Sequence, residues 1–251
     1  MDFETQTYRK VTWRLLPFLF LCYILSYLDR VNVGFAKLQM QTDLGFSDVV
    51  YGAGAGIFFI GYFFFEVPSN LLLQRFGARI WIARIMITWG IISSAMMLIH
   101  DRTTFFLLRF LLGMAEAGFF PGIIYYLTLW YPRRYRSRMV ALFMTAIALS
   151  NVIGGPLSGW ILSFLSDFYG LRGWQWLFLL EGLPSILVGA LTLRFLDDGP
   201  VKARWLDAEE KNLLVQRLQQ EEALKKAEGV HRNTLRDAFA SAQVWLLCAV
   251  Y

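Results

Sequence analysis

Charged residues are scarce in this 251-residue chain: Asp, Glu, Lys and Arg make up 17% of it, against about 25% in an average soluble domain. Hydrophobic residues account for 57% of positions and aromatic residues for 17%. Such an excess of apolar side chains needs an apolar solvent. The composition therefore excludes an ordinary soluble domain and indicates a protein of the lipid bilayer.

Cysteine and histidine are also rare. Cys22 and Cys248 lie in apolar runs without a partner at a useful spacing, and His100 and His231 form no HExxH pattern. These residues predict neither a disulfide framework nor a metal site. We expect no metal and no cofactor.

Long apolar runs fill most of the chain. A transmembrane helix needs about 20 apolar residues, and six runs reach that length, at roughly 15–36, 50–74, 80–99, 104–129, 139–164 and 174–195. The first run has a basic lead-in like that of a signal peptide, but it is too long and has no small-residue cleavage site. The sequence predicts an all-α membrane protein with a six-helix transmembrane bundle over residues 1–195.

The basic residues are unevenly distributed among the connections. They cluster before the first run and after the second and fourth runs, at Arg9, Lys10, Arg14, Arg75, Arg79, Arg84, Arg133, Arg134, Arg136 and Arg138. Each alternate connection holds one basic residue: Lys37, Arg102 or Arg172. The positive-inside rule therefore predicts a multi-pass protein of the plasma or inner membrane with a cytoplasmic N-terminus. The net charge of +5 reflects this topology, and we expect no nucleic-acid partner.

A polar segment follows the sixth run. It begins at DDGP, residues 197–200, and we assign residues 196–241 to a cytoplasmic linker. Asp207 and Glu210 resemble a capping box, and Leu213, Leu214 and Leu218 repeat at helical spacing, which predicts an amphipathic helix along the membrane face. Residues 242–251 turn apolar again and predict the start of a seventh transmembrane helix, truncated at Tyr251.

Six spans, a linker and the start of a seventh span are typical of one half of a twelve-span transporter. Such halves commonly consist of two inverted three-helix repeats. On this interpretation the fourth span is the counterpart of the first span, which directs attention to the charges in both.

Four ionisable residues interrupt these two spans: Asp29 and Arg30 in the first, and Arg109 and Glu116 in the fourth. The helical rise of about 1.5 Å per residue places both arginines at a similar depth and Glu116 roughly 10 Å deeper. A charge at the bilayer centre costs about 2.5 to 3.5 kcal/mol, so four unpaired charges would cost roughly 10 to 14 kcal/mol. We therefore expect these side chains to pair, to become neutral or to line one polar cavity.

Two interpretations of these charges remain open. Asp29 with Arg30, and Arg109 with Glu116, could be salt bridges that stabilise the bundle. Alternatively, the forked guanidinium groups of Arg30 and Arg109 bind an anionic substrate while the buried carboxyl groups of Asp29 and Glu116 carry protons. Two tyrosines, Tyr27 and Tyr62, are further candidates for contact with substrate.

Other unusual residues in the spans have a structural interpretation. Glu66 and Glu181 each lie near a proline, and we favour a structural role for both. Pro121 and Pro156 predict breaks in the fourth and fifth spans. The glycine-rich stretch YGAGAGIFF, residues 51–59, has no preceding strand and is no phosphate loop; Gly52 and Gly56 predict close helix contact instead.

Four motifs together resemble the anion:cation symporter family of the major facilitator superfamily. They are LDRVNVGFA, VPSNLLLQRFGARIW, RFLLGMAEAGFFPG and RGWQWLFLLEGLPS. Arg75, Gly77 and Arg79 match the superfamily's loop pattern between the second and third spans. The chain departs from that pattern at Asn70, Gln74 and Ala78, so a latch that depends on the missing aspartate is in doubt.

The resemblance implies proton-driven import of an organic anion such as a sugar acid, tartrate or an aromatic carboxylate. It also implies that Asp29 and Glu116 are proton sites and that Arg30 and Arg109 serve the anion. Members of the family have twelve spans, so the chain is expected to be a fragment that lacks its second half, or a truncated product without transport activity. An uncoupled facilitator or exchanger remains open; a membrane-embedded enzyme would need a nucleophile near the charges.

Overall fold

The computed structural model describes residues 2–227, which form helices and connections and contain no strand. The helices of the bundle are α1 (Phe3–Leu44), α2 (Asp48–Phe76), α3 (Ala78–Ala95), α4 (Arg102–Glu116), α5 (Phe119–Thr128), α6 (Arg133–Phe164) and α7 (Gly173–Phe195). The linker adds α8 (Ala208–Ala227). Short 3-10 turns lie at Met96–Leu98, Phe168–Gly170 and Pro200–Lys202.

Within residues 2–227, six helical segments are long and apolar enough to cross a membrane, with α4 and α5 together forming the fourth. This confirms the six spans predicted from the apolar runs. The helices run past several of those runs: α1 has 42 residues, or about 63 Å, twice the roughly 30 Å of a hydrocarbon core. The first span therefore extends well beyond the apolar layer.

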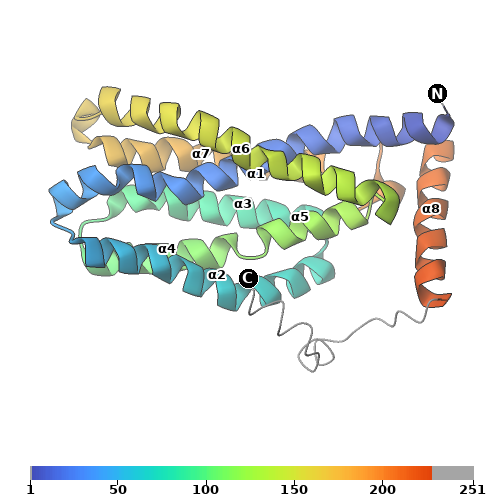
Figure 1. Cartoon of the computed structure of the whole chain (residues 1–251), viewed down its shortest axis with the longest axis horizontal. Coiled ribbons are helices and arrows are strands. Elements are labelled where there is room, and N and C mark those ends of the chain that lie inside the picture. The colour runs from blue at the N-terminus through green and yellow to red at the C-terminus, as the bar shows by residue number, and fades with distance from the viewer. Residues whose placement is uncertain (1, 228–251) are drawn as a thin grey trace.

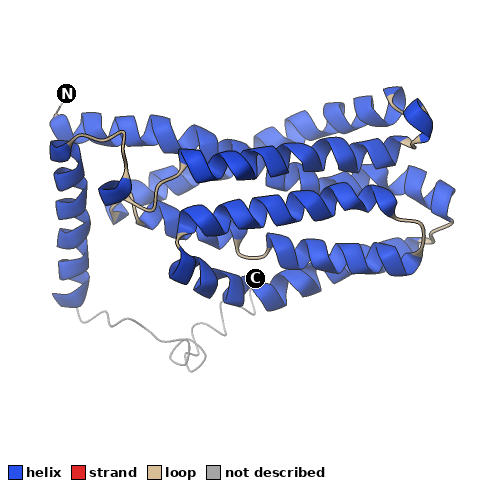
Figure 2. Cartoon of the chain, turned by 180° about the vertical axis from the view of Figure 1, so that it is seen from behind, coloured by secondary structure: helices blue, strands red, loops and turns tan. Residues whose placement is uncertain are grey.

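The six spans form one elongated bundle of roughly parallel helices (Figures 1 and 2). α1 packs against α6 and α7, α2 packs against α4, and α3 packs most extensively against α7. If the first three spans are matched in order with the last three, α1 corresponds to α4, α2 to α6 and α3 to α7. The α1–α6 contact then corresponds to the α4–α2 contact, and the α3–α7 contact corresponds to itself. The packing thus agrees with two inverted three-helix repeats.

Glycines allow the closest of these helix contacts. A Cβ atom at Gly113 of α4 would lie 2.0 Å from the carbonyl oxygen of Phe58 in α2, and one at Gly54 would lie 2.1 Å from the ring of Phe105. The prediction for Gly52 and Gly56 was wrong, because neither has a neighbour within 4 Å of such a Cβ in the described part of the chain. The glycine between them faces the neighbouring helix instead.

The fourth span is broken, whereas the fifth is not. α4 ends at Glu116 and α5 begins at Phe119. Between them Gly118 has a φ of 84°, and a Cβ atom at this position would lie 2.5 Å from the Ser69 hydroxyl. Pro121 lies in the first turn of α5, where backbone N–H groups have no acceptor within the helix, so a proline is tolerated there. The predicted break at Pro156 was wrong: α6 runs through it without interruption, as packed transmembrane helices allow.

The linker helix α8 crosses the end of the bundle at which α1 begins (Figure 1). The backbone N–H of Asp207 donates to Glu210 Oε2 at 2.9 Å, which is one half of the predicted capping box. Lys10 Nζ lies 2.7 Å from the same carboxylate, and Arg217 pairs with Glu4. Burial alone would raise the pKa of Glu210, but the hydrogen bonds from Lys10 and Asp207 and the Lys10 charge hold it below its usual value.

α8 also contacts the start of α6. Its Glu221 accepts hydrogen bonds from the backbone N–H of Arg133 and, at 3.4 Å, from the Arg136 side chain. Residues 242–251, the expected start of a seventh span, lie outside the described residues.

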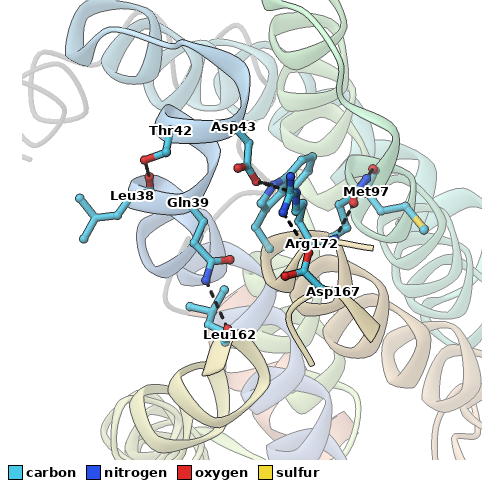
Figure 3. A network of polar contacts seen from close by, with 10 residues as sticks. Leu38, Gln39, Thr42, Asp43, Met97, Leu162, Asp167 and Arg172 are labelled. Carbon is cyan, nitrogen blue, oxygen red and sulfur yellow. Dashed lines mark hydrogen bonds and ion pairs between the residues drawn. The ribbon is translucent and has the colours of Figure 1, made fainter. Parts of the chain in front are cut away.

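A polar network joins the helix ends at the opposite side of the bundle (Figure 3). Asp43 accepts a hydrogen bond of 2.9 Å from Trp174 Nε1, and Gln175 donates to the Met97 carbonyl at 2.8 Å. Arg172 Nη1 lies 2.9 Å from Asp167 and Arg172 Nε 3.8 Å from Asp43. Arg172 therefore helps to hold this connection together.

The connection between α2 and α3 is held by the linker. Gly77 has a φ of 90°, and a Cβ there would lie 3.0 Å from Asp198 Oδ1. The same oxygen accepts a hydrogen bond of 2.9 Å from the backbone N–H of Arg79, in the first turn of α3. The linker thus supplies a carboxylate to the positive end of a helix. Arg75 lies at the end of α2, 5.8 Å from the ring of Phe76.

We predict that Asp198→Ala lowers the free energy of unfolding by about 1 kcal/mol, because the N-terminus of α3 loses a side-chain acceptor for the backbone N–H of Arg79. Thermal unfolding in detergent measures the change. Lys202→Ala is the matched control, since Lys202 forms an exposed ion pair with Asp198 that contributes little. Equal destabilisation by the two variants would assign the effect to the ion pair.

The second prediction concerns orientation. Single cysteines at Ser137 and Thr103, both exposed and at opposite ends of the bundle, are placed in a background in which Cys248 is serine; Cys22 is buried. An impermeant thiol reagent on intact cells should label position 103 and spare 137, because the basic end faces the cytoplasm. Permeabilised cells, in which both should react, are the control. The reverse pattern on intact cells would invert the predicted topology.

Candidate functional site

An ion pair joins the first and fourth spans inside the bundle. Arg30 Nη2 lies 2.6 Å from Glu116 Oε1, and the Ser26 hydroxyl, one turn earlier on α1, donates to the same oxygen at 2.9 Å. Glu116 is 3% exposed, whereas the Arg30 side chain is 30% exposed. The charges therefore pair between the spans, and neither of the pairings considered from sequence, Asp29 with Arg30 or Arg109 with Glu116, is formed.

Arg109 lies beside this pair. Its guanidinium carbon is 4.7 Å from the centre of the Phe58 ring, and that of Arg30 is 5.8 Å from the same ring. Both arginines thus reach one aromatic side chain of α2, in agreement with their expected similar depth.

No carboxylate among residues 2–227 forms an ion pair with the Arg109 guanidinium group. Arg109 is 2% exposed, and its Nε donates to the Gly54 carbonyl at 3.1 Å. Its Nη1 is buried and has no hydrogen-bond partner within residues 2–227. A buried cation with an unused donor is suited to bind an anion.

Local sequence explains how α4 presents this site. Arg109, Gly113 and Glu116 follow one another at intervals of four and three residues and so lie on one face of α4. Gly113 lets that face approach α2 closely enough for Arg109 to reach the backbone at Gly54. The break after Glu116 leaves this carboxylate at the end of α4.

The two candidate tyrosines differ in their contacts. The Tyr62 ring centre lies 5.3 Å from the Arg30 guanidinium carbon, so Tyr62 borders the site. Tyr27 is half-buried, and its hydroxyl makes no hydrogen bond in the described part of the chain. Tyr27 shares a side of α1 with Arg30, but the long arginine side chain extends away from it towards α4.

Asp29 contacts a different set of residues from the other three charges. Its carboxylate accepts hydrogen bonds from Trp89 Nε1 at 2.9 Å and from the hydroxyls of Ser93 and Ser185, both at 2.7 Å. Consecutive helix residues point about 100° apart. Asp29 consequently faces α3 and α7, while Arg30 faces α2 and α4.

The prolines do not account for Glu66 and Glu181. Both α2 and α7 continue through their prolines, Pro68 and Pro184. Glu66 is half-buried, and its side chain makes no hydrogen bond or ion pair with the residues that the structure describes; its backbone carbonyl accepts a hydrogen bond from the Asn70 side chain. Glu181 is 3% exposed and accepts a hydrogen bond of 2.9 Å from Ser158 of α6, so its contact lies on another helix.

Sequence reasoning missed the polar partners of these carboxyl groups. Ser93 and Trp89 are four residues apart on α3, and Ser185 and Glu181 four apart on α7, which is a detectable signal of one polar helix face. Hydroxyl side chains are common in transmembrane helices, and this pattern alone does not tell which carboxyl group they contact. In the described residues no group of three His, Cys, Asp or Glu side chains is arranged to hold a metal ion.

Known proteins resemble the chain closely. Residues 19–251 match the model of the Major Facilitator Superfamily. The chain is 55% identical over 240 residues to the putative metabolite transport protein NicT of Pseudomonas putida, and 52% identical over 250 residues to a putative tartrate transporter of Agrobacterium vitis. These matches cover 96% and 100% of this chain but 54% and 57% of the relatives; the chain thus spans about half of their length.

The fold has a counterpart among solved structures. A bacterial homologue of the human lysosomal transporter Spinster, in an inward-facing and occupied conformation, superposes with a TM-score of 0.67 over 78% of this chain and 46% of that one, at 20% identity. The helical bundle, the family model and these relatives confirm the resemblance seen in the four motifs. The chain belongs to the Major Facilitator Superfamily.

Proposed function

We propose that this chain is the substrate- and proton-binding half of a secondary transporter that carries a small organic anion across the membrane together with protons. The observation that carries the proposal is the arrangement of Arg30, Glu116 and Arg109: a carboxylate neutralises Arg30, whereas Arg109 has no carboxylate in contact in the part of the chain that the structure describes. The names of relatives for tartrate and metabolite transport support an organic-anion substrate.

Arg109 is the first attachment point for the anion. Transfer of a charge out of water is unfavourable without a partner, and the buried guanidinium has donors left over. A substrate carboxylate supplies the missing negative charge and accepts a pair of parallel hydrogen bonds from the planar group.

Glu116 links the anion to a proton. While Glu116 is ionised, it holds Arg30 at 2.6 Å. Protonation removes the charge of Glu116, so Arg30 can turn to the substrate instead, and proton binding and anion binding favour each other. The break between α4 and α5 directly after Glu116 resembles the discontinuous helices that form ion sites in transporters.

The exposed side of Arg30 indicates where a second half of the transporter would complete the site. Arg30 and Tyr62 are partly exposed at a level at which the surrounding helices carry apolar side chains. In the intact transporter a second six-helix half would cover this side, and substrate would bind between the two halves near the midplane.

A conservative substitution tests the anion site. We predict that Arg30→Lys, in the intact protein, weakens binding of tartrate or a related hydroxy acid by about tenfold or more, because hydrogen bonds to charged groups contribute about 1.5 to 3 kcal/mol and 1.4 kcal/mol is a factor of ten. Isothermal titration calorimetry across a panel of hydroxy and aromatic acids measures the affinity.

The control for this experiment is Arg102→Lys. Arg102 is exposed at the start of α4 and makes no ion pair in the described residues, whereas Arg172 contacts Asp167 and Asp43. Unchanged affinity is expected for Arg102→Lys. Equal losses in both variants would show that Arg30 has no special part in binding.

Glu116→Gln tests proton coupling. The amide imitates the protonated carboxyl group, so we predict that the variant still binds substrate and exchanges it across proteoliposome membranes. It should lose accumulation driven by an imposed pH gradient, because the group no longer titrates. Wild-type protein under the same gradient is the control, and undiminished uphill uptake by the variant would leave Glu116 with a structural role and favour an uncoupled facilitator or a different coupling residue.

A further inference from the structure

A second pair of buried carboxyl groups lies on the other side of α1, and the proposed anion site does not use it. Asp29 is 2% exposed and Glu181 is 3% exposed. On α1, Asn32 follows Asp29 by three residues; on α7, Ser185 follows Glu181 by four. The helices run in opposite directions, so Asp29 meets Ser185 while Asn32 faces Glu181.

The two carboxyl groups differ greatly in the number of donors around them. Asp29 accepts hydrogen bonds from Trp89, Ser93 and Ser185, enough to stabilise an ionised carboxylate. Glu181 receives one hydrogen bond of good geometry, from Ser158, and a weaker side-chain interaction from Asn32; its Oε2 is buried without a partner of good geometry in the described part of the chain.

An unused acceptor lies next to Glu181. Asn32 is 0% exposed and interacts with the Glu181 carboxyl group through its side-chain amide, while its Oδ1 has no donor among residues 2–227. A proton on Glu181 would turn the carboxyl group into a donor, and Asn32 Oδ1 is an acceptor available to it. Protonation thus supplies the donor that Asn32 Oδ1 lacks while Glu181 is ionised.

Charge leads to the same result. Neither Asp29 nor Glu181 forms an ion pair in the described chain; the Asp29 charge acts on Glu181, and the Glu116 charge of α4 acts on Asp29. The side chains that donate hydrogen bonds to the pair from α3, α6 and α7 are neutral: Trp89, Ser93, Ser158 and Ser185. Two carboxyl groups in one water-poor site cannot both stay ionised without a cation.

We infer that Asp29 and Glu181 form a second proton-binding site, in which Glu181 carries the proton and Asp29 the negative charge. This deepens the proposed function and rests on it for its role in transport, since Asp29 and Arg30 are consecutive residues of α1 and the Glu116 charge acts on Asp29. Titration of the pair tracks the state of the anion site through that helix turn.

The test is infrared spectroscopy of the intact protein in detergent, with the carbonyl stretch of protonated carboxyl groups followed as a function of pH. Glu181→Gln should remove the intensity of one protonated group. Asp29→Asn removes a neighbouring negative charge and should move the titration to lower pH by about one unit or more, and Ser158→Ala removes the donor to Glu181 and should move it to higher pH.

Glu209→Gln is the control, because Glu209 is exposed on α8 and should leave the band unchanged. A band of unaltered intensity in Glu181→Gln overturns the assignment. If that variant does not fold, the opposite shifts in Asp29→Asn and Ser158→Ala decide the question, and their absence overturns it equally. The infrared measurement does not depend on transport. If the wild-type protein showed no gradient-driven uptake, the proposed symport would be refuted, whereas the infrared titration would still decide whether Glu181 carries a proton.

Discussion

The pairing of Arg30 with Glu116 across the α1–α4 interface is the interaction on which the polar interior of this bundle depends. A charge facing hydrocarbon is costly, and the pair removes two such charges at once. The other two charges of these spans have different partners. Because Glu116 pairs with Arg30, Arg109 contacts the backbone of α2 and the face of Phe58 instead. Asp29 accepts hydrogen bonds from hydroxyl and indole groups of α3 and α7.

Much of this fold follows from the sequence because its cause is simple. Twenty or so apolar residues per run suffice to place a transmembrane helix, and the six runs all became helices. The approximate depth of Arg30 and Arg109 also followed from helical rise. The pairing of the charges did not follow. The helical rise gives the depth of a residue, but it does not tell which neighbouring helix the side chain faces. Asp29 and Arg30 are adjacent in sequence and lie in different sites.

Breaks and contacts were harder to predict for the same reason. Pro121 and Pro156 look alike in sequence, yet only the span with Gly118 breaks, at a φ that favours glycine and beside Ser69 of another helix. Gly52, Gly54 and Gly56 form one run, and tertiary packing uses the middle one. In the sequence Asp198 marks only the beginning of the polar linker. Its hydrogen bond to the start of α3 joins residues that are far apart in the chain, so no local sequence pattern predicts it.

The contacts of α8 restrict how this half of the molecule can move. Glu4 and Lys10 of α1 hold one side of the linker helix, and Arg133 and Arg136 of α6 hold Glu221 on it. α1 belongs to the first repeat and α6 to the second, so α8 acts as a brace between the two. Sliding of one repeat past the other would have to break these contacts first, so the brace favours movement of the six-helix bundle as one rigid body.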